Sequence, residues 1–140
     1  MKIKSLTVFS IMSIVIFGAA ILFAQVSKPW PVPDKYVKMK NPVKSDVKSL
    51  ANGKKLFIQY CQDCHGKKGK GDGTKATDIK TPVADLTSAS VQSEADGSLF
   101  YKISEGRNDM PRAKKDLPDP TDIWALVNYV RTLKKVQAKN

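Results

Sequence analysis

The residues best able to do chemistry lie in one short stretch, Cys61-Gln62-Asp63-Cys64-His65. It contains both cysteines and the only histidine of the 140-residue chain. Two thiols at this spacing can each form a thioether with one vinyl group of the same porphyrin, and the next residue, a histidine, can bind the iron from one face. The Cys-x-x-Cys-His spacing therefore predicts the covalent attachment of one haem c, with His65 as an iron ligand.

Three other interpretations compete for the same residues. A structural zinc site needs four ligands, and this stretch offers three. A thioredoxin-like redox pair requires a βαβ setting, which the surrounding sequence does not indicate. The third is a plain disulfide between Cys61 and Cys64. Haem attachment is the favoured hypothesis, and the rest of the chain tests it.

The opposite face of the iron needs a second ligand or stays open. No second histidine exists, so ligation by two histidines of this chain is excluded. Met1 and Met12 lie in an N-terminal apolar segment, and Met39 precedes the motif. Met110, in a predicted loop between two helices, is the favoured second axial ligand. The alternatives are an open iron, a lysine ligand, or a Met110 that only fills a gap in the core.

Helical spacing predicts a first helix that begins near Ser45 or Asp46, either of which suits an N-cap, and leads to the motif. Its residues at helical spacing are Val47, Leu50, Ala51, Lys54, Phe57, Ile58 and Cys61. Gly53 interrupts this helix at a cost of about 1 kcal/mol relative to alanine. We therefore expect another helix to approach closely at Gly53.

Two further helices follow the motif, and no strand is convincing, so the predicted fold class is all-α. One runs from Ser93 or Asp96 to Glu105, with Gly106 as its C-cap. The last begins after Asp119, a good N-cap. The expected apolar faces are Leu99, Phe100 and Ile103 in the first of these, and Ile123, Leu126, Val127, Val130 and Leu133 in the second.

The N-terminus reads as a targeting or anchoring segment. Residues 6–26 carry no charge and follow Lys2 and Lys4. The run is longer than the apolar region of about 7–15 residues in a cleaved signal peptide, and it suffices for a spanning helix of about 20 residues. An uncleaved anchor is favoured over a cleaved signal. Both interpretations place the motif outside the cytoplasm.

The sequence thus predicts three parts: an anchor or signal at 1–27, a tether at 28–45, and a haem domain at 46–137. Prolines and lysines in the tether exclude a regular helix and favour an extended, semi-rigid segment. Trp30 and Tyr36 suit either the membrane interface or packing on the domain.

A net charge of +11 favours anionic partners, namely nucleic acid, acidic lipid or an acidic protein surface. An extracytoplasmic location argues against nucleic acid. The cations expected near the haem are Lys67, Lys68, Lys70, Lys75, Lys80, Lys102, Arg107, Arg112, Lys114 and Lys115. We predict that some of them steer the domain toward redox proteins with acidic docking surfaces.

Taken in order, these motifs resemble the class I (mitochondrial-type) monohaem cytochromes c, in their bacterial form, over about residues 46–135. The matching residues are Gly53, Phe57 and Cys61; Cys61 to Gly66; Gly69, Gly71, Asp72 and Gly73; Leu99, Ile103, Gly106, Met110 and Pro111; and Leu126 to Val130 with Tyr129. The attachment motif is specific. The Met110-Pro111 pair and the final helix are weak signals alone, and they support the resemblance because they follow the motif in the family's order.

The resemblance implies a class I cytochrome c fold around one covalent haem, with the first and last helices crossing near Gly53. It implies iron held by His65 and Met110, and one-electron transfer in a bacterial respiratory or related chain, without enzymatic activity. A backbone carbonyl near Pro82 is the candidate acceptor for the other ring nitrogen of His65. Arg107 and Trp124 are candidate donors to a haem propionate.

The expected partners are an oxidase or a quinol-oxidising complex, and the membrane through the N-terminal helix. The expected location is the cytoplasmic membrane, in a single pass with the haem domain on the periplasmic side, or the periplasm if the signal is cleaved. One alternative function is that of a fixed haem subunit in a larger membrane redox complex. A haem peroxidase or ligand sensor with an open iron is less favoured.

Overall fold

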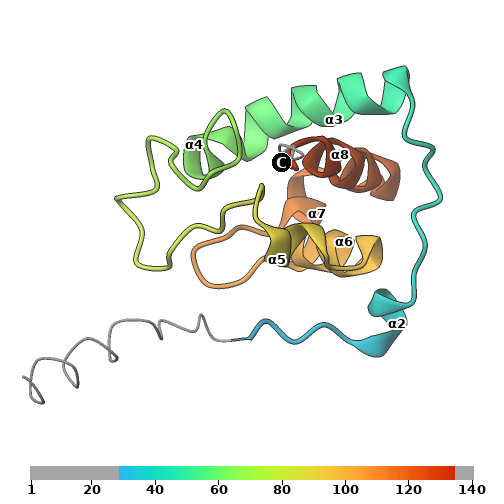
Figure 1. Cartoon of the computed structure of the whole chain (residues 1–140), viewed down its shortest axis with the longest axis horizontal. Coiled ribbons are helices and arrows are strands. Elements are labelled where there is room, and N and C mark those ends of the chain that lie inside the picture. The colour runs from blue at the N-terminus through green and yellow to red at the C-terminus, as the bar shows by residue number, and fades with distance from the viewer. Residues whose placement is uncertain (1–28, 135–140) are drawn as a thin grey trace, which may run out of the picture. The chain divides into compact units, whose positions relative to one another are not determined.

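The computed structural model describes residues 29–134 (Figure 1). The chain divides into two units, Met1–Pro31 and Val32–Asn140, and the described helices all belong to the second. The predicted anchor or signal segment, residues 1–27, lies outside the described residues. Within 29–134, no helix is both long and apolar enough to cross a bilayer.

The described part of the chain is helical, which confirms the predicted all-α class. Its helices are α2 (Asp34–Val37), α3 (Val47–Tyr60), α4 (Gln62–His65), α5 (Ala89–Gln92), α6 (Asp96–Glu105), α7 (Ala113–Asp116) and α8 (Pro120–Thr132). Between residues 29 and 134 the only pairing of strand type is an isolated bridge between Arg107 and Met110.

The three predicted helices begin and end close to the expected residues because their caps are present. The Asp46 carboxylate accepts a hydrogen bond from the Ser49 amide at 2.9 Å and caps α3. Asp119 accepts from the Thr121 amide at 2.8 Å and caps α8. Gly106 ends α6 with φ of 59°, a left-handed conformation that glycine adopts without strain.

Helix α8 packs against α3 on one side and α6 on the other (Figure 1). Gly53 is buried where α3 meets α8, and a Cβ at this position would overlap the carbonyl oxygen of Ala125. The prediction of a close helix–helix approach at Gly53 is confirmed. Phe57, 1% exposed, and the partly buried ring of Tyr129 extend this contact, with centroids 5.2 Å apart.

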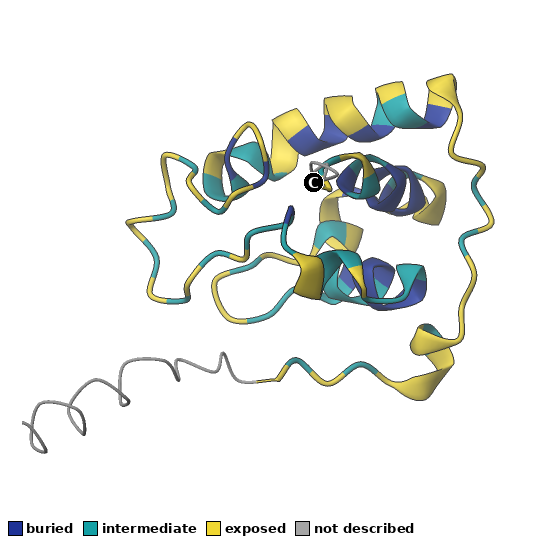
Figure 2. Ribbon diagram, in the orientation of Figure 1, coloured by how far each residue is buried: buried dark blue, intermediate teal, exposed yellow. Residues whose placement is uncertain are grey.

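The buried face of α3 differs from the predicted one. Ser49, Gly53, Leu56 and Phe57 point inward, whereas Val47 is 86% exposed. Ala51 and Ile58 are also exposed, and Figure 2 shows α3 with one buried and one exposed side. The apolar pattern predicted the wrong face because two of the inward-facing residues, Gly53 and Ser49, are small or polar. These two residues make the close contacts with neighbouring segments.

The core lies between α3, α6 and α8. Its buried members are Leu56, Phe57, Leu99, Phe100, Leu117, Ile123, Trp124, Leu126, Val127 and Val130. Trp124 is 3% exposed and stacks on Phe100 with ring centroids 4.2 Å apart. Trp124 is therefore a core residue, and its contact with a haem propionate stays a prediction.

The stretch predicted to be an extended tether is partly helical and packs on the domain. Its residues 34–37 form α2, a single turn that the prolines and lysines had argued against. Tyr36 lies 4.7 Å from the ring of Tyr101, and a Cβ at Gly97 would overlap the carbonyl oxygen of Tyr36. Of the two settings expected for Tyr36, packing on the domain is the one observed.

A buried asparagine in α8 also holds this stretch. Asn128 donates to the carbonyl of Val43 at 3.1 Å and to the hydroxyl of Ser49 at 2.8 Å. Its side-chain oxygen accepts from the amide of Asn41 at 2.8 Å. All its polar atoms therefore have partners, which is the condition for burying an amide at low cost.

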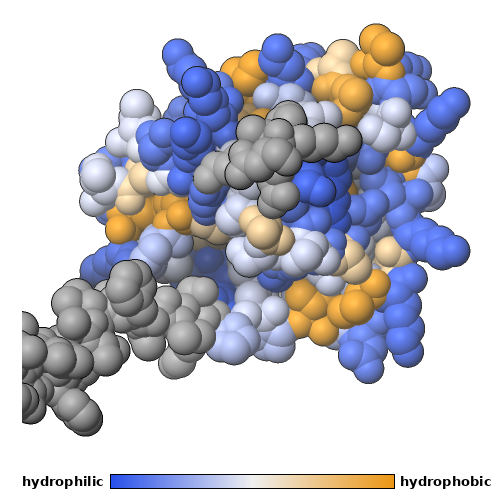
Figure 3. Space-filling view, viewed as in Figure 1, coloured by the Kyte–Doolittle hydropathy of each residue, from blue (hydrophilic) through white to orange (hydrophobic). Residues whose placement is uncertain are grey.

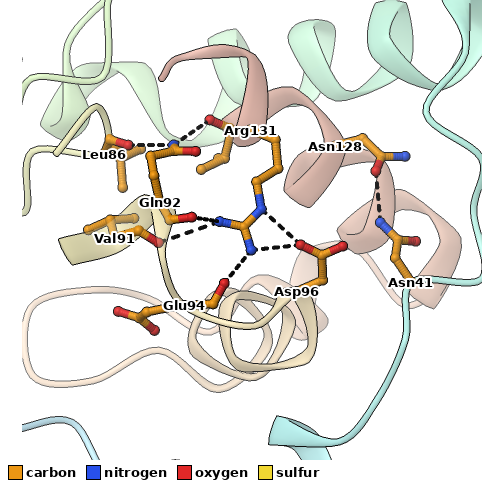
Figure 4. A network of polar contacts seen from close by, with 9 residues as sticks. Asn41, Leu86, Val91, Gln92, Glu94, Asp96, Asn128 and Arg131 are labelled. Atoms are coloured by element: carbon orange, nitrogen blue, oxygen red, sulfur yellow. Dashed lines mark hydrogen bonds and ion pairs between the residues drawn. The ribbon is translucent and has the colours of Figure 1, made fainter. Parts of the chain in front are cut away.

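Arg131 in α8 binds the segment between α5 and α6 (Figure 4). Its guanidinium donates to Asp96 at 2.8 and 2.7 Å, to the carbonyl of Gln92 at 3.0 Å and to that of Glu94 at 2.5 Å. Arg131 also lies in the last turn of α8, where a cation complements the helix dipole. In the structure, its side chain connects α8 to the end of α5 and the start of α6.

Candidate functional site

The short helix α4 places the motif residues on one tight turn directly after α3. The amides of Cys64 and His65 both donate to the carbonyl of Cys61, at 3.2 and 2.9 Å. Cys61 itself donates to Phe57 at 2.9 Å, so the turn continues the end of α3. Both thiols and the imidazole are thereby presented from one rigid piece of backbone.

The glycine-rich loop after α4 folds back onto the motif. The amides of Gly71 and Gly73 donate to the carbonyls of His65 and Cys64, at 2.9 and 3.1 Å. Gly71 has φ of 78°, and a Cβ there would approach the carbonyl oxygen of Val83 to 2.5 Å. The loop therefore braces the motif, and its glycines allow that close approach.

His65 has one ring nitrogen fixed and the other available. Its Nδ1 lies 3.3 Å from the carbonyl oxygen of Ala84, which can only accept, so Nδ1 carries the proton. This acceptor lies two residues after Pro82, in the predicted loop. Burial lowers the pKa of His65 and favours the neutral imidazole, the form that binds a metal through Nε2.

The two cysteines are half-buried free thiols. Burial raises the pKa of Cys61 to about 12, and the nearby Cys64 adds to the shift. A nucleophilic redox cysteine needs the opposite, a lowered pKa, so this environment argues against the thioredoxin-like interpretation. In the described residues no three His, Cys, Asp or Glu side chains gather as a metal site of their own.

Met110 lies half-buried in a tight turn after α6. The backbone groups of Arg107 and Met110 exchange two hydrogen bonds of 3.0 Å each, and Asn108 adopts φ of 53° within the turn. Met39, the other methionine among the described residues, lies just after α2 and is 37% exposed.

A contact that the sequence did not indicate joins the Met110 turn to the segment that supports His65. The amide of Thr81 donates to Oδ2 of Asp109 at 2.9 Å, and this hydrogen bonding lowers the pKa of Asp109. In Figure 1, the loop before α7 and the long loop after α4 extend on the same side of the domain. No motif announces an aspartate–amide bond between two loops, so nothing in the sequence could have identified it.

These groups suit a covalent haem. A c-type haem needs two thiols, a neutral histidine and often a thioether. This chain has two free thiols on one turn, a histidine oriented by the Ala84 carbonyl, and Met110 on a loop that is hydrogen-bonded to the segment of that carbonyl. An all-helical domain with this motif defines the class of protein, a class I-like monohaem cytochrome c that carries electrons on a covalently bound haem.

Comparison with known proteins specifies the family. Residues 48–130 match the family described as cytochrome c oxidase, cbb3-type, subunit III, and the chain belongs to this family. Subunit FixP of the cbb3-type cytochrome c oxidase of Bradyrhizobium diazoefficiens is 31% identical over 83 residues, which cover 59% of this chain and 27% of FixP. The chain thus spans about a quarter of that relative's length.

Two solved structures are similar to this domain. A chain of the Kuenenia stuttgartiensis reducing HAO-like protein complex Kustc0457/Kustc0458 aligns with a TM-score of 0.61 and 25% identity, over 79% of this chain and 53% of that one. The KustC0563 c-type cytochrome aligns with a TM-score of 0.50 and 30% identity, over 59% of this chain and 98% of its own.

Nine of the ten cations predicted to lie near the haem fall into two groups, and the tenth, Arg107, is half-buried. Lys75, Lys102 and Lys114 form ion pairs with acidic side chains at 2.8, 2.5 and 2.7 Å, and the Lys102 side chain is only 19% exposed. Those exposed without such a pair are Lys67, Lys68, Lys70, Lys80, Arg112 and Lys115. Figure 3 shows hydrophilic side chains over much of the visible surface, with hydrophobic patches between them.

Proposed function

We propose that Cys61 and Cys64 attach one haem through thioethers, and that His65 and Met110 are the two axial ligands of its iron. The observation that carries the proposal is the hydrogen bond from His65 Nδ1 to the Ala84 carbonyl. It leaves Nε2 unprotonated, with a lone pair that can bind the iron. The bond between Thr81 and Asp109 supports Met110 as the second ligand, because it ties the methionine's turn to the same loop.

This ligand set supports electron transfer without enzymatic activity. Two axial ligands occupy both faces of the iron and leave no position for a substrate. Methionine–histidine ligation and burial raise the reduction potential, because a thioether and a low dielectric favour the less charged ferrous state. The domain would then accept and pass on single electrons through the haem edge.

Removal of Met110 should change the ferric spectrum. The weak far-red absorption band of a methionine–iron bond should be present in the wild type and lost in Met110→Ala, because the thioether is its source. Met39→Ala removes the other described methionine and should keep the band. A Met110→Ala protein with an intact band would refute this ligand assignment.

We propose further that exposed lysines after the motif steer the domain to acidic surfaces of redox partners. The rate of electron transfer to a partner oxidase should fall about tenfold between ~0.01 M and ~0.15 M ionic strength, as the Debye length shrinks from about 30 to about 8 Å. Lys67→Glu/Lys68→Glu should weaken this dependence more than the matched pair Lys54→Glu/Lys55→Glu on the outer face of α3. A flat salt profile in the wild type would contradict the role.

The family favours a second candidate, a haem subunit fixed in a membrane oxidase complex, since FixP is described as a subunit of a cbb3-type cytochrome c oxidase. In both candidates residues 1–27 form the anchor or signal, 28–45 connect it, and 46–137 carry the haem outside the cytoplasm. Purification in mild detergent separates the two functions. A free carrier emerges alone, whereas a fixed subunit emerges with stoichiometric oxidase subunits.

A further inference from the structure

The turn that carries Met110 is closed at its base and attached at its tip. The two Arg107–Met110 hydrogen bonds, each 3.0 Å long, close the base. Asp109, next to the methionine, reaches out of the turn and accepts from the Thr81 amide at 2.9 Å. This hydrogen bond connects the turn to the long loop after α4.

The other end of that attachment leads to His65. Three residues after Thr81, the carbonyl of Ala84 accepts from Nδ1 of His65 at 3.3 Å. The same stretch is held in place by the bond from Leu86 to the Gly69 carbonyl at 2.7 Å, and its residue Val83 lies against Gly71. Residues 81–84 therefore have one end fixed on the histidine side and the other end attached to the methionine turn.

We propose that Asp109 is a positioning residue for Met110. Through Thr81 it fixes the methionine turn to the segment that orients His65, so one stretch of backbone sets the spacing of both axial ligands. The proposal rests on the axial ligation proposed above. The Arg107–Met110 bonds fix the shape of the turn, and the Asp109–Thr81 bond connects the turn to the loop.

Loss of this attachment should make the methionine easier to displace from ferric iron. Imidazole, added as a competing ligand, must displace the Met110 sulfur to bind. In Asp109→Ala its apparent affinity should rise about three- to tenfold, the effect of one exposed hydrogen bond to a charged group. Asp109→Asn retains a side-chain oxygen that can accept from Thr81 and should stay close to the wild type.

The experiment follows the far-red band of ferric holoprotein during imidazole titration. Asp116→Ala, which removes an exposed carboxylate from α7, is the matched control and should behave as the wild type. Thr81→Pro removes the amide donor and should reproduce the gain, and the double variant with Asp109→Ala should gain no more than either alone. Hydrogen exchange at the Thr81 amide should accelerate in Asp109→Ala.

Equal imidazole affinity in the wild type and Asp109→Ala would overturn the proposal, and so would an equal gain in Asp116→Ala. In either case a band that disappears in Met110→Ala would leave the ligand assignment intact. A band that survives in Met110→Ala would instead refute the ligation itself. The two failures are therefore distinguishable.

Discussion

Replacing both Cys61 and Cys64 by serine should abolish covalent haem attachment almost completely. Cys64 lies in the single turn of α4 and Cys61 is its N-cap, and no other cysteine exists to form a thioether. On a denaturing gel stained for haem, the wild-type chain should carry the stain and the double variant should not. Each single variant should retain one thioether. Its reduced absorption spectrum should differ from that of the wild type, because one vinyl group stays unreacted.

Gln62→Ala is the control for this experiment. It changes a residue between the two cysteines, so it tests whether any substitution in the turn prevents attachment. Its haem should co-migrate with the chain as in the wild type. Haem that stays on the double serine variant under denaturing conditions would show that attachment uses another residue.

Replacing Gly53 by alanine should lower the free energy of unfolding of the holoprotein by about 2–4 kcal/mol. The added Cβ would overlap the Ala125 carbonyl oxygen, which belongs to helix backbone and cannot rotate away. Separation of α3 from α8 would outweigh the gain of about 1 kcal/mol in helix propensity. Denaturant unfolding of wild type and variant measures the difference.

Val47→Ala is the matched control on the same helix. Its side chain is 86% exposed, so the change should stay within about 0.5 kcal/mol. The pair also tests which face of α3 is buried. A larger loss in Val47→Ala than in Gly53→Ala would favour the face that the apolar pattern predicted.

The sequence predicted the features of this fold that depend on local chemistry. Asp46, Asp119 and Gly106 mark helix ends because their caps are satisfied within a few residues. Gly53 indicated a close approach because a glycine within a helix is costly without one. The attachment motif was specific because its spacing fits one porphyrin.

The features that the sequence could not predict depend on partners distant in the chain. Asn128 contacts residues more than 75 positions away, Val43 and Ser49, and Arg131 binds carbonyls before α6. No sequence pattern around either residue indicates which residues it contacts. The short helices α2, α5 and α7 were missed because one turn leaves no periodicity to detect.

The most direct test of the account is the proton NMR spectrum of the reduced holoprotein. The haem ring current moves the methyl resonance of an axial methionine far upfield, where no other side chain appears. Ligation of the iron by Met110 predicts one such methyl, absent from Met110→Ala and present in Met39→Ala. An upfield methyl that survives in Met110→Ala, or a wild-type spectrum without one, would contradict an iron held between His65 and Met110.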